Sequence, residues 1–360
     1  LIEGKTVANH PAITSAFGIE GISTFFAARA IWDNQAYKED ARLGQIQEAF
    51  FSTTERAAES LAHYNDVLTK TQASSVWFRA PHISATLQNY FQIYHDALAQ
   101  NATFVLKLRF VKEIIESKGK PSEAQMVMLY KTLLLLEVTQ YHYEPNHSRA
   151  SLARDVPRME APVLSNALRY CMNHFNATTV EQFKSKLRHH LQSFPFGNGA
   201  RDLGKVLLFT AEYNPGRAIP FSESVYKTIA YEHVLPVNFE DAPLDDDEMS
   251  ELKKTLAVSS DSSAMEGEIS ATLNLLGNAA LLQRSANSEL QDALPHKKLA
   301  ITETKKLGSS WSSGSLQDLR TAQTAPDTEN WDGDYIRRRS AVLADNLVSF
   351  LLDDAMLQLL

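Results

Sequence analysis

The chain has 360 residues, of which 44% are hydrophobic, so it is long enough for a large core and two domains. Its net charge of −8 disfavours a protein that coats nucleic acid without specificity, but it leaves room for one local basic groove. The single cysteine, Cys171, excludes an internal disulfide or a cysteine-built zinc site and favours a reducing cytoplasm. Its apolar neighbours Leu168, Met172 and Phe175 predict a core residue rather than a nucleophile.

The start of the chain shows no secretory signal, and the longest apolar run, residues 133–136, is much too short to span a bilayer. The sequence therefore predicts a cytoplasmic protein with no membrane partner. Because the chain begins at Leu1 rather than at a methionine, we expect it to be part of a longer protein with another domain upstream.

Sparse glycine and apolar residues at helical spacing predict helices through the first two hundred residues, for example over residues 45–68. The break at residues 119–122 should end one helix, and Ser122 is expected to cap the next, which runs to Tyr143. A proline-rich stretch near residue 160 favours a domain boundary there. We therefore predict a helical linker or support domain over 1–160 and a second domain over 161–360.

Further helices are predicted in the second domain. They are expected over residues 164–175, 180–194 and 203–213, from an acidic start at 245–248, and as one helix or a helix pair over 334–360. The serine-rich segment 309–315 is expected to be a low-complexity loop. The fold class predicted from these patterns is mainly α.

Four short segments of this second domain follow one another in an order that favours phosphodiester hydrolysis. In residues 231–236 an acid and a histidine end an apolar run, and residues 276–282 hold an asparagine beside a second apolar run. Residues 285–288 place another asparagine on a polar helix, and residues 296–298 add a histidine and two lysines. This is the order in which a one-metal nuclease presents its general base and its metal ligands.

The candidate general base is His233, because a neutral imidazole accepts a proton from water near neutral pH. One Mg²⁺ or Mn²⁺ ion would bind the phosphate and the leaving oxygen, and it needs only one or two protein oxygens. Glu232 and Asn287 are the candidate ligands. Adjacent strand residues point to opposite faces, so Glu232 and His233 can share a site only where the strand ends, and Pro236 indicates that it ends there.

Asn278 and two lysines would support this chemistry. Asn278 follows a glycine at a strand edge and can bond backbone groups of the facing loop, which would hold His233 in its orientation and tautomer. Lys297 or Lys298 would contact the phosphate backbone as a point charge. The predicted catalytic residues are thus His233, Asn278 and Asn287, with Lys297 and Lys298 as the DNA contacts.

Each of these residues also has an ordinary structural interpretation. A lone histidine before an apolar run is usually structural, and Glu232 could orient a neighbour or cap a turn. Asn278 could be a turn residue, Asn287 could be an exposed helix residue, and lysines are solvated by default. The ordered set, rather than any one member, favours the catalytic hypothesis.

Taken together, these segments resemble the HNH, or His-Me finger, nucleases, in which a β-hairpin and a helix hold one metal. More narrowly, Glu-His-Val-Leu-Pro, Leu-Gly-Asn-Ala-Ala-Leu-Leu, Asn-Ser-Glu-Leu and Lys-Lys are similar to the C-terminal nuclease domain of GmrSD-type modification-dependent restriction enzymes. Trp331, Ile336 and Arg339 fit the last helix of that domain. The resemblance covers residues 160–350.

The resemblance implies a helical N-terminal region followed by a helical domain with an embedded ββα-metal (HNH) hairpin–helix site. It also implies a Mg²⁺- or Mn²⁺-dependent DNA endonuclease or nickase of restriction-type phage defence, acting on DNA that can carry modifications. The third HNH position is an asparagine here, Asn287, which other members tolerate, whereas the aromatic usually seen after that helix is not evident.

Full-length relatives carry an N-terminal NTP-hydrolysing domain with an Asp-Gly-Gln-Gln-Arg signature, which this sequence lacks. Residues 1–160 are therefore expected to link such a domain, as a partner within a longer protein, to the nuclease. A homodimer is compatible with the sequence and would bear on whether one strand or both are cut. The rival hypothesis is a non-catalytic helical DNA-docking or assembly module, which the acidic charge favours, and the same site chemistry would also cleave RNA.

Overall fold

The structure is a computed structural model, and it describes most of the chain after residue 120. The described residues are 121–142, 159–197, 199–212, 229–241, 246–257, 262–290, 292–324 and 331–360, with Ile83, Ser84, Leu87, Gln88, Tyr90, Phe91, Tyr94, Leu106, Phe110 and Glu113. The helix expected over 45–68 lies outside these residues. The contacts divide the chain into two compact units. Residues 121–142 and 159–174 belong to the first unit, and the described residues from Phe175 to Leu357 belong to the second. The predicted boundary at residue 160 stays a prediction.

The first unit contains α8 (Glu123–His142) and α10 (Val163–His174), which pack against each other. Ser122 caps α8 as predicted: its Oγ accepts the Gln125 N–H at 3.2 Å, and Gln125 Oε1 accepts the Ser122 N–H at 2.9 Å. This reciprocal pair satisfies two backbone donors at the helix start. The apolar run 133–136 lies on α8 and is buried in the protein, which accounts for its apolar composition.

Cys171 lies fully buried on α10, as its apolar pattern predicted. Burial raises the pKa of its thiol to about 12, and a hydrogen bond with Thr139 on α8 only partly opposes that rise. Since the thiolate is the nucleophile, the folded protein keeps this cysteine in its unreactive form.

We expect Cys171 to resist alkylation in the native protein at neutral pH and to react rapidly once the chain unfolds. Mass spectrometry after iodoacetamide treatment, with and without denaturant, measures both states. Because the chain has one cysteine, each modified molecule reports on this site alone. Rapid stoichiometric labelling of the folded protein would contradict the buried placement.

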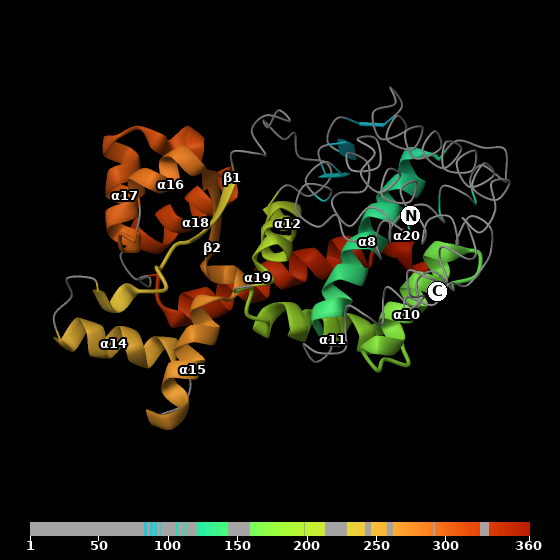
Figure 1. Cartoon of the computed structure of the whole chain (residues 1–360), viewed down its shortest axis with the longest axis horizontal. Coiled ribbons are helices and arrows are strands. Elements are labelled where there is room, and N and C mark those ends of the chain that lie inside the picture. Colours follow the sequence, from blue (N-terminus) through green and yellow to red (C-terminus); the bar gives the residue numbers. More distant parts are fainter. Residues whose placement is uncertain are drawn as a thin grey trace, which may run out of the picture. The chain divides into compact units, whose positions relative to one another are not determined.

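The second unit is mainly helical, with one pair of strands among its described residues (Figure 1). Its elements are α11 (Val180–Ser193), α12 (Arg201–Glu212), β1 (Ile229–His233), η2 (Phe239–Asp241), α14 (Asp246–Leu256), α15 (Ser262–Leu273), η3 (Leu276–Asn278), β2 (Ala279–Gln283), α16 (Arg284–Leu290), α17 (Pro295–Thr304), η4 (Leu307–Ser310), α18 (Ser313–Thr324), α19 (Gly333–Leu351) and α20 (Asp354–Leu357). The predicted mainly α class is confirmed, and the expected C-terminal helix pair is α19 with α20.

The two strands are antiparallel although more than forty residues separate them in the sequence. Tyr231 lies opposite Leu281, and His233 lies opposite Ala279. The Leu281 N–H and C=O bond serine groups on the far side of β2, so Tyr231 directs its own N–H and C=O away from β2. The carbonyl groups of Ile229, Tyr231 and His233 therefore line the outer edge of β1.

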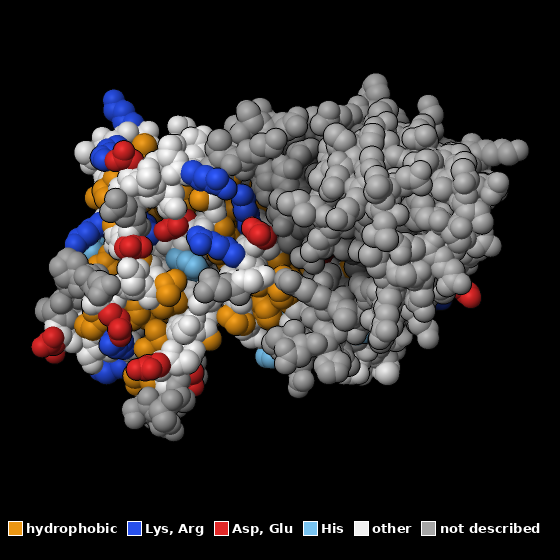
Figure 2. All heavy atoms as spheres, in the orientation of Figure 1, with side chains coloured by type: hydrophobic (Ala, Val, Ile, Leu, Met, Phe, Trp, Pro, Cys, Tyr) orange, Lys and Arg blue, Asp and Glu red, His pale blue; other side chains and the backbone are white. Residues whose placement is uncertain are grey.

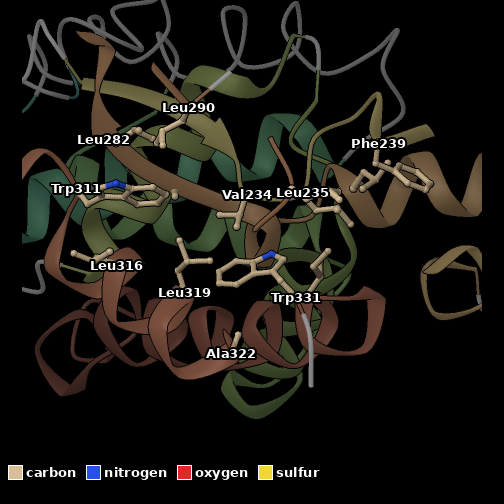
Figure 3. Packing of buried hydrophobic residues seen from close by; sticks show 14 of the residues in the cluster. Val234, Leu235, Phe239, Leu282, Leu290, Trp311, Leu316, Leu319, Ala322 and Trp331 are labelled. Carbon is tan, nitrogen blue, oxygen red and sulfur yellow. The ribbon is translucent and has the colours of Figure 1, made fainter. Parts of the chain in front are cut away.

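A core of aromatic and aliphatic side chains holds the strands against the helices that follow them. Trp331 is almost fully buried and lies close to Val234 and Leu235, the residues directly after β1 (Figure 3). Trp311 belongs to the same cluster and forms a β-bridge with Leu282. The core therefore holds the loop that follows His233 in place through Val234 and Leu235.

The serine-rich segment 309–315 does not form the predicted loop. It contains part of η4, the buried Trp311 and the start of α18 at Ser313. The prediction was wrong because composition alone does not show that one tryptophan anchors the segment to β2, where its burial outweighs the loop tendency of the serines.

The close approach of η3 to α19 requires a glycine at position 277. A Cβ there would lie 2.0 Å from the Ile336 carbonyl oxygen and 2.5 Å from Ser340 Oγ. Ser340 Oγ also accepts the Gly277 N–H at 2.9 Å, which ties η3 to the helix. The glycine therefore lets the chain turn into β2 while touching α19.

We expect Gly277→Ala to destabilise the protein by about 3 kcal/mol or more, because the methyl group would meet backbone atoms that cannot move independently. Gly267→Ala, on the exposed middle of α15, has no atom within 4 Å of its added Cβ and should instead stabilise by about 0.5–1 kcal/mol. Urea unfolding of both variants measures these opposite signs. Equal effects would contradict the close approach.

No helix in the described part of the chain is long and apolar enough to cross a membrane.

Candidate functional site

The four predicted segments meet around the paired strands. His233 is the last residue of β1, as Pro236 predicted, and Asn278 immediately precedes β2. Asn287 lies on α16, which follows β2 directly and packs against both strands. The strand register places His233 and Asn278 at one end of the strand pair, whereas α16 begins at the other end, where Gln283 lies opposite Ile229. Lys298 of α17 contacts both Glu232 and His233.

The imidazole of His233 is largely enclosed, and its Nε2 is buried without a hydrogen-bond partner among the described residues. Burial lowers the pKa of His233 to about 4, and the charges of Arg201 and Lys298 add to this effect. A side-chain hydrogen bond with Asn274 opposes it. The ring is therefore neutral at physiological pH, in the form that can accept a proton.

Asn278 is fully buried and clamps the loop after His233, as the sequence predicted. Its Oδ1 accepts the Leu235 N–H at 2.9 Å and the Trp331 indole N–H at 3.1 Å. Its Nδ2 donates to the carbonyls of Leu235 at 2.9 Å and Leu273 at 2.8 Å. All four side-chain bonds are satisfied, so Asn278 acts on the backbone rather than facing a substrate.

The two candidate metal ligands present oxygens of different kinds. Glu232 keeps its side chain only 13% exposed, and its Oε1 accepts a bond from Lys298. The Asn287 Oδ1 is buried without a hydrogen-bond partner among the described residues, which is unusual for an amide oxygen. No group of three or more His, Cys, Asp or Glu side chains in the described ranges is placed to hold a metal.

These donors fit a Mg²⁺-like ion. Such an ion prefers oxygen ligands, keeps several waters and is commonly held by only one or two protein groups. One carboxylate and one unsatisfied amide oxygen on neighbouring elements match that requirement. A cysteine- or histidine-based site would need a different set of residues.

The two lysines expected to contact DNA differ sharply. Lys297 is exposed on α17, where a phosphate can reach it. Lys298 is fully buried, and its ammonium donates to the His233 carbonyl at 2.6 Å and to Glu232 Oε1 at 3.2 Å. The assignment of Lys298 to DNA therefore needs correction, because its charge is enclosed within the protein.

Two further cations, which sequence reasoning missed, bind the outer edge of β1. Arg201 Nη2 donates to the Tyr231 carbonyl at 2.5 Å, and Lys205 Nζ donates to the Ile229 carbonyl at 2.7 Å. With Lys298 on the His233 carbonyl, each outward carbonyl of β1 has a cationic partner. Figure 2 shows Lys and Arg side chains beside a histidine on one face of this unit.

Arg201 stands out because it is exposed at the start of α12 and its charge lowers the pKa of His233. Its spacing from Lys205 places both on one face of the helix. No local pattern in the sequence pairs these residues with a strand that begins about thirty positions later, so only the fold reveals this edge.

Arg339 of α19 binds the turn that leads into β2. Its Nη1 donates to the carbonyls of Gly277 at 3.0 Å and Ala279 at 2.7 Å. Its Nη2 lies 3.3 Å from Glu212 Oε1, and its Nε donates to Asp318 at 2.6 Å. Burial raises the pKa of Glu212, whereas Arg339 opposes that rise.

The fold and site together define a helical domain in which two antiparallel strands, the turn before the second strand and a helix packed against both carry one histidine, one acid and two asparagines. Residues 181–346 match the family described as GmrSD restriction endonucleases, C-terminal domain. This stretch includes β1, β2, α16 and α17, and it confirms that this part of the chain is a GmrSD-type C-terminal nuclease region. Searches of curated proteins and of solved structures gave no match.

The match of residues 181–346 to a restriction endonuclease domain supports a nuclease role for this region and implies a DNA substrate.

Proposed function

We propose that the paired strands β1 and β2, together with α16, form a one-metal HNH site that hydrolyses DNA phosphodiester bonds in restriction-type phage defence. One observation supports this above all: His233 Nε2 and Asn287 Oδ1 are both buried and both lack a partner among the described residues. A general base needs a nitrogen that is free to accept a proton, and a Mg²⁺-like ion needs an oxygen that is free to bind it. Their elements, β1 and α16, are in contact.

In this proposal His233 accepts the proton of the attacking water. Its lowered pKa keeps the imidazole neutral at the pH of the cell. Asn278 holds the backbone just after His233 through bonds to both polar groups of Leu235, so the ring is positioned before substrate binds. Preorganisation of this kind removes an orientational cost from the chemical step.

Glu232 and Asn287 would hold Mg²⁺ or Mn²⁺, which when bound neutralises phosphate charge and stabilises the leaving oxygen. Lys297, exposed on α17, and Arg201, exposed beside His233, would contact the phosphate backbone. Arg201 retains further guanidinium donors beyond the one bound to Tyr231, so it can bond a phosphate while remaining anchored.

A supercoiled-plasmid assay with Mg²⁺, Mn²⁺ or EDTA tests this function. We expect nicked or linear product with either metal, loss of product in EDTA, and recovery when Mg²⁺ is added back. Binding of the plasmid without metal-dependent product would favour the rival DNA-docking module. Cleavage of RNA in preference to DNA under the same conditions would contradict the substrate assignment.

A further inference from the structure

We propose that Lys298 is a positioning residue and the internal counter-ion of Glu232, and that it sets the affinity of the site for a divalent cation. This inference rests on the proposed function, because it takes Glu232 as a metal ligand. The observation behind it is the contrast between Lys298, which has no exposed side-chain surface, and its exposed neighbour Lys297.

The Lys298 ammonium holds two adjacent residues at once. It donates to the backbone carbonyl of His233 at 2.6 Å and to the side chain of Glu232 at 3.2 Å. The shorter bond is the one to the carbonyl, which faces the outer edge of β1 and not the partner strand. Lys298 therefore fixes the end of the strand from which the base and the acid both project.

The same contact leaves part of the carboxylate free for another cation. Lys298 bonds Oε1 of Glu232, whereas Oε2 has no contact among the hydrogen bonds and ion pairs found in the described residues. A carboxylate can serve two cations through its two oxygens. A divalent ion on Oε2 would then lie close to a fixed positive charge.

That charge should weaken cation binding. Like charges a few ångströms apart in a partly enclosed site repel strongly, so removing the ammonium should tighten Mn²⁺ binding by about tenfold. The Glu232 carboxylate and the strand end would also lose their anchor, so turnover should fall by roughly 10- to 100-fold. A merely structural lysine predicts the opposite change in affinity, because a disordered site binds metal less well.

Mn²⁺ binding, measured by the electron paramagnetic resonance signal of the free ion, tests this inference without relying on cleavage. The variants are Lys298→Met, Lys298→Gln, Lys297→Met and Glu232→Gln, each checked for folding by thermal unfolding. We expect about tenfold tighter binding in both Lys298 variants and a change within about twofold for Lys297→Met. Glu232→Gln should bind at least about tenfold more weakly.

The outcomes separate the two proposals. If Glu232→Gln leaves Mn²⁺ affinity unchanged, Glu232 is not a ligand and that part of the proposed function fails. If Glu232→Gln weakens binding but neither folded Lys298 variant binds more tightly, the counter-ion inference alone is overturned. Lys298→Gln is included because its uncharged amide can still donate a hydrogen bond near Glu232, whereas Lys298→Met leaves that carboxylate without a polar neighbour at this position.

Discussion

His233→Ala should reduce the rate of DNA cleavage by roughly 100- to 10,000-fold while the protein remains folded, since this is the usual contribution of a general base. The side chain is largely enclosed at the end of β1, and its Nε2 makes no hydrogen bond to the described residues. The variant loses the hydrogen bond between the ring and the Asn274 side chain. Single-turnover cleavage of a plasmid measures the rate, and circular dichroism checks the fold.

The control is His189→Ala, because His189 is an exposed histidine on α11, outside the hairpin. It should cleave like the wild type. Added imidazole should restore part of the activity of His233→Ala, since a small base can occupy the space left by the ring. A His233→Ala protein with full activity would contradict the assignment of the base.

Arg339→Met should destabilise the protein by about 3–5 kcal/mol, because it leaves the buried Glu212 carboxylate without its cation and removes donors from two backbone carbonyls. The neighbouring Arg338 is exposed on the same helix, so Arg338→Met should change stability by less than about 1 kcal/mol. Urea unfolding of both variants gives the comparison.

The deficit of Arg339→Met should depend on pH. Burial already raises the pKa of Glu212 above 4.5, and loss of Arg339 would raise it further. A carboxyl whose folded pKa is raised contributes stability at low pH that is lost as the pH rises through that pKa. The variant should therefore be closer to the wild type near about pH 5 than near about pH 8. A deficit that grows on acidification would contradict this account.

Much of the helical framework could be predicted from the sequence because the signals are local. The Ser122 cap, the core position of Cys171 and the end of β1 before Pro236 each depend on a few neighbouring residues. The contacts of Asn278 with the facing loop were also predicted, because a glycine and an asparagine beside an apolar run favour a tight turn at a strand edge.

The remaining features depend on pairs that are distant in sequence. Lys298 reaches Glu232 across 66 positions, and Arg339 reaches Glu212 across 127. Nothing in the local pattern distinguishes a buried lysine from an exposed one when the two are adjacent. Spacing alone therefore identified the ordered set, whereas the roles of its basic members required the fold.

The central claim is that His233 and a divalent ion act together on DNA, and one plasmid experiment tests it most directly. Wild-type protein and His233→Ala are each incubated with supercoiled DNA in Mg²⁺ and in EDTA. The proposed site predicts product only for the wild type with Mg²⁺. Cleavage that persists in EDTA, or that His233→Ala retains at the wild-type rate, would contradict it.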